Sequence, residues 1–353
     1  MESQEKIREI IRAGTLAPSV DNCQPWRFAV SSDTITLYLD SGRAEFFGDY
    51  AYTASYVTMG TVIENMVLVA GRFGLQASIS LFPGGADATI ASITFNEGKF
   101  TDDPLADFMA KRCTNRRKFK KDPLAGSVSK DLARIPADNG ARLHLFEDRK
   151  TIKRLTALAA DVDGIIFDHR LLHANLFRWL RWDDTEISST QDGMPVSTLE
   201  LSGAERLFFR LLSSWRTQSF LNSFALNRAI GKINSALLEN SASLGMIIME
   251  NSGDVDYLNG GRFFERVWLQ ATSLGLAFQP LGGLPFLLTR IIKGGSDGFS
   301  RRQYDILRAV YEELRRMMPL TEKNALIILF RLGYAGDPSG RTLRRPLEDI
   351  LSS

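Results

Sequence analysis

Apolar positions recur with different periods along the first hundred residues. Isoleucines follow a helical spacing among charged residues at 7–11, and Pro18 ends that helix because its ring cannot donate a hydrogen bond. Residues 34–40 alternate as a half-buried strand, whereas residues 50–73 carry a long helical pattern. Further strands are predicted at 28–30, 76–82 and 88–95, the last two around a Pro83-Gly84-Gly85 turn.

The remainder of the chain shows the same mixture of periods. Helices are predicted at 150–182, 261–274 and 304–317. Strands are predicted at 142–147, 244–249 and 325–330, and the continuous apolar run at 244–249 is typical of a buried strand. Helices and strands mixed in this way indicate an α+β protein.

The sequence contains an internal repeat with an offset of 201 residues. Residues 60–75 align without gaps on residues 261–276, and both copies continue toward a Gly-Gly turn. The identical pairs are Gly60/Gly261, Glu64/Glu265, Leu68/Leu269, Ala70/Ala271, Gly74/Gly275 and Leu75/Leu276. A weaker echo sets 136–146 against 18–30. Chance likeness between two amphipathic helices is the alternative, but the matched glycines favour two fused copies of one unit.

Composition narrows the class of protein. The chain has 353 residues, 44% of them apolar, which is ample for a buried core. A net charge of +2 predicts no nucleic-acid partner, and two cysteines predict no disulfide framework. No signal pattern and no apolar run of about 18 residues is seen, so we expect a cytoplasmic protein without an integral membrane segment.

Residues 17–28 form a short polar segment between the first helix and a strand. Ser19 and Asn22 can bond through side chain and backbone, and Gln24 offers both donor and acceptor. A connection with so many polar groups is typical of a binding loop. On composition alone, an ordinary capped helix end remains the alternative.

A basic segment at 112–121 opens the second copy. Arg112 and Arg116 flank Thr114, and two guanidinium groups with a hydroxyl between them suit the oxygens of a phosphate. Because charged runs are usually solvated surface, a basic linker is the alternative.

The run Ala17-Pro18-Ser19-x-x-Asn22-x-Gln24-Pro25-Trp26-x-Phe28 resembles the flavin loop of the FMN-dependent nitroreductase family. Together with the repeat, it resembles the tandem Acg-type branch of that family. The resemblance implies a nitroreductase-like α+β fold of two fused copies, each with a central, mostly antiparallel sheet flanked by helices. The copies would pack as an internal pseudo-dimer with one FMN between them, and a further homodimer is left open.

The resemblance also implies which residues hold FMN. The basic segment is similar to the phosphate-binding element of the family, residues 276–283 to the segment along the flavin ring, and residues 340–347 to the closing element that returns a cation to the phosphate. Gly282 stands where many members have Glu, a departure that bears on donor binding. The expected cofactor-binding residues are Pro18, Ser19, Asn22, Gln24, Arg112, Cys113, Thr114, Arg116, Gln279, Pro280, Leu281, Gly282, Gly283, Arg341, Arg344 and Arg345.

Two halves are expected, 1–108 with the flavin loop and 109–353 with the phosphate-binding element and the tail. Residues 183–240 depart from a compact nitroreductase and combine basic with aromatic and aliphatic residues. The resemblance implies a lid over the flavin. Core packing and contact with a membrane surface are the alternatives for such basic amphipathic helices.

The implied activity is NAD(P)H-dependent two-electron reduction of a small acceptor, a nitroaromatic or a quinone, by ping-pong flavin chemistry. Such chemistry needs no catalytic protein acid or base. A lidded FMN store without turnover is the second hypothesis. An oxidase or dehydrogenase with a dedicated substrate is the third.

Two pairs of residues leave other chemistry open. His169 and His173 are four apart and could share a metal, but no third ligand is evident, so no metal is expected. Cys23 and Cys113 lie in the two motifs expected to meet at FMN, where a redox role or two inert small residues are the alternatives.

Overall fold

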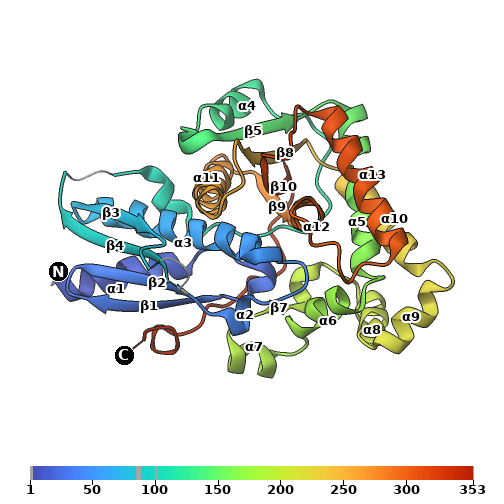
Figure 1. Cartoon of the computed structure of the whole chain (residues 1–353), viewed down its shortest axis with the longest axis horizontal. Helices are drawn as coiled ribbons and strands as arrows, with labels where there is room; N and C mark the ends of the chain where they lie inside the picture. The colour runs from blue at the N-terminus through green and yellow to red at the C-terminus, as the bar shows by residue number, and fades with distance from the viewer. Residues whose placement is uncertain (1–2, 85–88, 100–101, 353) are drawn as a thin grey trace.

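The computed structural model describes residues 3–84, 89–99 and 102–352; Gly85 of the predicted turn lies outside them. Within these residues, two four-stranded antiparallel sheets are flanked by helices (Figure 1), and the α+β prediction is confirmed. The first sheet has the order β1-β2-β4-β3, with β1 Trp26–Ser31, β2 Thr34–Leu39, β3 Leu75–Leu81 and β4 Thr89–Glu97. The second has the order β5-β8-β10-β9, with β5 Ala141–Phe146, β8 Ser243–Met249, β9 Ala277–Leu281 and β10 Ala325–Gly333.

Each strand of the first sheet has a counterpart at the same position in the second. The long helices α3 (Thr53–Arg72) and α11 (Asp254–Ser273) both have 20 residues, and they start 201 residues apart, the offset of the repeat. The short turn η1 (Val20–Asn22) precedes β1 as η4 (Asp138–Gly140) precedes β5, and the middle residue of each has a left-handed φ. The order of elements therefore repeats, as two fused copies require.

Helices α3 and α11 cross at the centre of the molecule (Figure 1). A Cβ added to Gly60 would lie 2.0 Å from the carbonyl oxygen of Leu258, and one added to Gly261 would lie 2.0 Å from that of Val57. Val57 and Leu258 also differ by 201, so the crossing is nearly two-fold symmetric. Only glycine permits this backbone approach, which explains why these positions of the repeat are glycines.

The two sheets differ in how they are covered. Every residue of β8 and β10 is buried, because α11 packs on one side of this sheet. The other side is covered by α5 (Arg149–Ile166), α12 (Gly283–Ile292) and α13 (Arg301–Met317). In contrast, β3 alternates between half-buried and exposed positions, as expected for a sheet with one covered face. The core of the first half lies between this sheet and the helices α1 (Ser3–Thr15) and α3.

The halves differ most in the connection between their first two strands. Two residues join β1 to β2, whereas residues 147–242 join β5 to β8. This insertion contains α5 Arg149–Ile166, α6 Arg170–Arg178, β6 Leu180–Arg181, α7 Asp184–Thr190, β7 Met194–Pro195, η5 Val196–Leu199, α8 Gly203–Leu212, α9 Trp215–Asn222 and α10 Leu226–Leu238. The expected lid at 183–240 is thus the later part of a longer insertion.

The single helix predicted for 150–182 is wrong. It divides into α5 and α6 because His169 has an extended backbone, with φ of −119°, and caps α6. Its Nδ1 accepts a hydrogen bond from the Leu172 amide at 3.4 Å, and its ring stacks on Phe47 at 4.2 Å. A capping histidine carries no periodic signal, so the break was not visible in the apolar pattern.

The last strands of the halves are also joined differently. Between β9 and β10 the second half adds α12 (Gly283–Ile292) and α13 (Arg301–Met317), whereas only residues 82–88 separate β3 from β4 in the first half. The remaining short elements are α2 Ser41–Ala44, η2 Tyr50–Tyr52, η3 Pro104–Phe108, α4 Gly126–Ala133 and η6 Leu347–Asp349.

The C-terminal tail leaves the second half and returns to the first. The Phe28 amide of β1 donates to the Ile350 carbonyl at 2.8 Å, and the Ser352 amide donates to the Phe28 carbonyl at 2.7 Å. Figure 1 shows the C-terminus beside β1. The tail therefore ties the halves together, and the division into 1–108 and 109–353 stays a prediction.

In the described part of the chain, every helix falls short of what crossing a bilayer requires.

Candidate functional site

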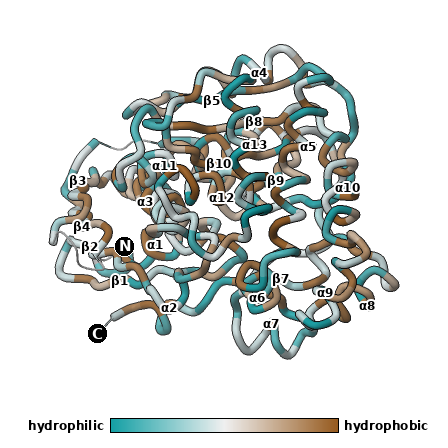
Figure 2. The backbone as a smooth tube through the Cα atoms, turned by 45° about the vertical axis from the view of Figure 1, so that its right-hand side comes forward, coloured by the Kyte–Doolittle hydropathy of each residue, from teal (hydrophilic) through white to brown (hydrophobic). Residues whose placement is uncertain are grey.

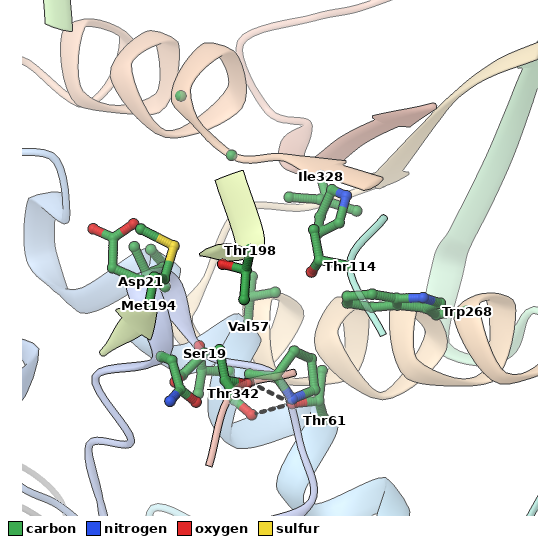
Figure 3. Close-up of a pocket in the computed structure, with 18 of the residues that line it drawn as sticks. Ser19, Asp21, Val57, Thr61, Thr114, Met194, Thr198, Trp268, Ile328 and Thr342 are labelled. Carbon is green, nitrogen blue, oxygen red and sulfur yellow. Dashed lines mark hydrogen bonds between the residues drawn. The ribbon is translucent and has the colours of Figure 1, made fainter. Parts of the chain in front are cut away.

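A cavity of about 450 Å³ lies where the two halves meet the insertion and the tail (Figure 3). This volume is in the range of roughly 300–1,000 Å³ typical of cofactor pockets. The predicted residues that line it are Pro18, Ser19, Asn22, Arg112, Cys113, Thr114, Arg116, Pro280, Gly282, Gly283, Arg341 and Arg344. Four predicted residues are not among its lining, namely Gln24, Gln279, Leu281 and Arg345.

The polar loop after α1 is fixed by hydrogen bonds. The Ser19 hydroxyl accepts from the Gln24 amide at 3.0 Å, and Thr61 of α3 donates to the Pro18 carbonyl at 3.4 Å (Figure 3). Asn22, at a left-handed φ of 56°, donates through Nδ2 to the carbonyl of Gly193 in the insertion at 2.9 Å. The loop therefore forms a rigid wall that also positions the insertion.

Gln24 holds the loop to the tail and to the insertion. Its side chain is fully buried; Nε2 donates to the Gln191 carbonyl at 2.9 Å, and Oε1 accepts from the Arg345 amide at 2.9 Å. Arg345 directs its guanidinium to the Asp349 carbonyl. The two residues thus support the wall from behind.

Arg112 and Arg344 line the cavity at the end of α1, and the charge of Glu265 acts on both. Arg112 is paired with the fully buried Glu265 at 3.2 Å, donates to the Leu16 carbonyl at 2.6 Å and lies over the ring of Trp268. Arg344 donates to the carbonyls of Leu16 and two neighbours at 2.7–3.1 Å, where the α1 dipole favours a cation.

Burial disfavours the charged forms of Glu265 and Arg344. Desolvation raises the pKa of Glu265 to about 6, although Arg112 opposes the shift. Desolvation, with repulsion from Arg112, lowers the pKa of Arg344 to about 9. Glu64, the counterpart of Glu265 in the repeat, is instead paired with Arg262 at 2.9 Å and Arg266 at 2.8 Å. The wall at Arg112 and Arg344 thus carries a cationic excess that suits an anion.

Arg116 extends this cationic wall toward the insertion. The Asn115 amide donates to the Phe278 carbonyl of β9 at 2.8 Å, which fixes the segment along the second half. Among the described residues, the Arg116 guanidinium donates only to the Thr198 carbonyl at 3.4 Å and to the Met194 thioether sulfur at 3.3 Å. Both are weak partners for a charged donor, so Arg116 keeps hydrogen-bonding capacity for a ligand. In contrast, Arg341 donates to the Ala110 and Lys111 carbonyls.

The start of α12 brings backbone amides to another side of the cavity. A Cβ at Gly282 would lie 2.7 Å from the Phe286 ring, and one at Gly283 would lie 3.0 Å from Ile166. A larger residue at 282 would displace the Phe286 ring, and one at 283 would need a small shift of Ile166. The amides at the helix start carry partial positive charge. Behind this wall, Gln279 accepts from the buried Arg331 at 2.8 Å and Leu281 packs against the second core.

Asp21 is a lining residue that sequence reasoning missed. It adopts a left-handed φ of 50° and accepts from Asn175 of α6 at 3.1 Å. Burial raises its pKa to about 6, while the charge of Arg116 acts in the opposite direction. Figure 3 places Asp21 with Met194 at one end of the view and Trp268 at the other. Asp21 occupies an unspecified position of the loop motif, so the motif gave no signal for it. The internal repeat singled out Glu265 as one of its identical pairs, but did not indicate that Glu265 pairs with Arg112.

The histidines and cysteines take different positions. His169 and His173 bond through Nε2 to the carbonyls of Gly298 at 2.9 Å and Leu212 at 2.8 Å. Among the described residues, no group of three or more His, Cys, Asp or Glu could hold a metal. Cys113 lines the cavity, whereas Cys23 is buried outside its lining, and burial raises the pKa of the Cys23 thiol.

Fold and site together define a fused pseudo-dimer with a cationic cofactor-sized cavity where its halves meet. No family model matches the chain. It is 26% identical over 209 residues, 58% of its length, to a Mycobacterium tuberculosis H37Rv protein provisionally named NAD(P)H nitroreductase acg, of which it covers 61%. It is also 25% identical over 347 residues to the uncharacterized protein MT1398 of Mycobacterium tuberculosis strain CDC 1551. This alignment includes 98% of the present chain but 48% of that relative. The chain thus spans about half to three fifths of these relatives. The chain is thus similar to nitroreductases, and among them to the Acg-like branch.

Solved structures are more distant. A BluB-like flavoprotein from Clostridium difficile 630 is 12% identical, with a TM-score of 0.39 over 70% of this chain and 98% of that one. A nitroreductase with bound FMN from Desulfitobacterium hafniense DCB-2 is 14% identical, with a TM-score of 0.38 over 72% and 99%. Overlaps this weak carry no inference about the site.

Proposed function

We propose that the cavity between the halves binds FMN and that the protein uses NAD(P)H to reduce a small acceptor such as a nitroaromatic or a quinone. The observation that carries the proposal is the convergence of the loop at 17–28, the basic segment at 112–116 and the glycines at 282–283 on one cavity. These segments are far apart in the sequence, yet each is one that the family resemblance associates with FMN.

The residues present fit an anionic cofactor with a flat ring. Glu265 is paired with Arg112 and acts on Arg344 through its charge alone, and the partners that the structure describes for Arg116 are weak, so a phosphate would supply the missing negative charge. Thr114 adds a hydroxyl beside them. The amides of Gly282 and Gly283 suit the ring, because glycine lets backbone come close and the helix start favours electron-rich atoms.

When bound, FMN would supply the two-electron chemistry between nicotinamide and acceptor. The chain's own part is to position and to enclose. Aromatic side chains from α11 and α12, including Trp268, Phe264 and Phe286, exclude water from one side of the cavity. The insertion contributes Leu172, Leu176 and other apolar side chains on another side, in the manner of a lid.

The experiment is the visible spectrum of purified protein incubated with FMN, freed of unbound cofactor, and then treated anaerobically with NADPH or NADH. We expect bound flavin absorbance that decreases on addition of the donor. Absence of bound flavin would refute the site assignment. Bound flavin that neither donor reduces would refute the reductase and support the lidded FMN store.

A further inference from the structure

The outer surface of the insertion carries a concentration of exposed apolar side chains. Among the described residues, most large hydrophobic side chains that are exposed lie on or beside α8, α9 and α10, at the corner of the molecule away from β3 (Figure 1). We define the apolar-basic face by these side chains, namely Leu207, Phe208, Leu211, Phe220, Phe224 and Ile233. Phe224 is 73% exposed and Ile233 is 69% exposed, so these are not partly covered core residues.

The packing of α8 does not require this second apolar surface. Leu212 of α8 is already buried, and Phe209 packs against Phe177 and Trp182 in a small core of the insertion. Ser202 and Glu205 form a capping box at the start of α8, so local hydrogen bonds stabilise this helix end. Figure 2 shows hydrophobic and hydrophilic positions alternating along α8 and α9 at the same corner. The outward apolar side chains therefore need another explanation than folding.

The charged residues on and beside α8, α9 and α10 are almost all basic. The exposed basic residues between 202 and 238 are Arg206, Arg210, Arg216, Arg228 and Lys232. Among the described residues none of them forms an ion pair, and the single acidic residue of the range, Glu205, is engaged in the cap. A second copy of this face would bring like charges together, which disfavours self-association through it. Large apolar side chains between cations are the pattern of a helix that lies on an anionic bilayer.

We propose that the apolar-basic face docks the protein on the surface of a bilayer that contains anionic lipid. Phe220 and Phe224, whose rings contact each other at 5.5 Å, would enter the boundary between headgroups and acyl chains. The five cations would lie against the lipid phosphates. This is contact with the surface and needs no helix that crosses the membrane.

The docked face is adjacent to the cavity. Helix α6 contributes Leu172, Asn175 and Leu176 to the cavity wall, and its His173 bonds to the Leu212 carbonyl at the end of α8. A bilayer on the apolar-basic face would therefore lie just beyond the outer wall of the cavity. The proposal itself rests on the exposed side chains and holds whether or not the cavity binds FMN.

The test is flotation of the full chain with vesicles of phosphatidylcholine and phosphatidylglycerol in equal parts, and with phosphatidylcholine alone. We expect binding to the anionic vesicles only, weakened by high salt. Arg206→Gln with Arg210→Gln should lower the partition coefficient about fivefold for each cation removed. Phe220→Ser with Phe224→Ser should lower it by about tenfold or more, because two aromatic anchors are lost. Val30→Ser, which removes an exposed apolar side chain from β1, is the matched control and should bind as the parent does.

Three results would overturn the proposal: no binding to anionic vesicles, binding unchanged in both paired variants, or a dimer in ultracentrifugation that Phe220→Ser with Phe224→Ser dissociates. The substituted side chains are exposed, and unaltered thermal unfolding of each variant would show that any loss of binding is not a loss of fold.

Discussion

Gly60 and Gly261 face each other where α3 crosses α11, with the Cα of Gly261 only 2.9 Å from the position that a Cβ of Gly60 would occupy. The two residues are equivalent in the repeat and lie near the pseudo-two-fold axis between the halves. Both helices also line the cavity, through Thr58 and Thr61 of α3 and Phe264 and Trp268 of α11. The separation of the helices therefore sets the width of the cavity.

Gly261→Ala should push the two helices apart. The new Cβ would lie 2.0 Å from the Val57 carbonyl oxygen, which neither backbone can absorb without moving. We expect a loss of about 2 kcal/mol or more in the free energy of unfolding, measured by urea titration. Gly126→Ala in α4 is the control, because no atom lies within 4 Å of its added Cβ. Equal midpoints for the two variants would contradict the close crossing.

Arg116→Gln should weaken FMN binding without unfolding the protein. Its guanidinium has weak partners at present, so the fold loses little, whereas a charged bond to phosphate contributes about 1.5–3 kcal/mol, or about tenfold in affinity and more. Titration of flavin fluorescence measures the change. Its neighbour Arg117, which donates to Ser339 on the surface, provides the control Arg117→Gln. Equal affinities would place the phosphate elsewhere.

Arg112→Ala should affect stability as well as cofactor binding. It leaves the fully buried Glu265 without its ion-pair partner, a change that typically costs about 3–5 kcal/mol. Adding Glu265→Gln should recover part of the lost stability, because no unpaired charge then remains. Thermal unfolding of the single and double variants checks this. A double variant less stable than Arg112→Ala alone would show that Glu265 has a different role.

Glu265 should make stability depend on pH. Its pKa is raised by burial from 4.5 to about 6, so the folded state holds a proton that the unfolded state has released between these values. The parent should therefore lose stability relative to Glu265→Gln as the pH rises from 4.5 to 6, with no further change at neutral pH. The expected difference is on the order of 1–2 kcal/mol. Unfolding free energies measured across this window would show parallel curves if Glu265 had an ordinary pKa.

Gln24→Ala should loosen the tail and the insertion together. The change removes the part-buried bonds to the Gln191 carbonyl and the Arg345 amide, at about 0.5–1.5 kcal/mol for each bond lost. Hydrogen exchange should rise at Arg345 and at residues 191–193. Gln76→Ala, at an exposed position of β3, is the control. Exchange that rises uniformly would mean general destabilisation instead.

The sequence predicted those parts of the fold that repeat. The apolar pattern placed α3 within three residues at either end, whereas the helix predicted at 261–274 begins seven residues after the start of α11. Alternation placed most strands within one or two residues. The break at His169 and the start of the insertion at residue 147 escaped prediction. Both depend on which side chains cap or cover an element in the folded state, and a periodic pattern does not record that.

The sequence predicted which segments line the cavity, but not which of their side chains point into it. A motif gives the order of residues along the chain, and Ser19, Asn22 and Arg116 do line the cavity, whereas Gln24 and Arg345 point behind its wall. Asp21 shows the opposite case. It faces the cavity from a position that the motif leaves free, because the left-handed turn directs it inward.

The pairing of Glu64 differs from that of Glu265, although the two are equivalent in the repeat. Arg262 and Arg266 neutralise Glu64, while their counterparts Thr61 and Asn65 are uncharged. In an assembly of two identical chains, every substitution would appear twice and both sides would keep the same charges. Once duplication has joined the two units in one gene, each can mutate independently. One side can then become a neutral scaffold while the other specialises, which an ordinary homodimer cannot do.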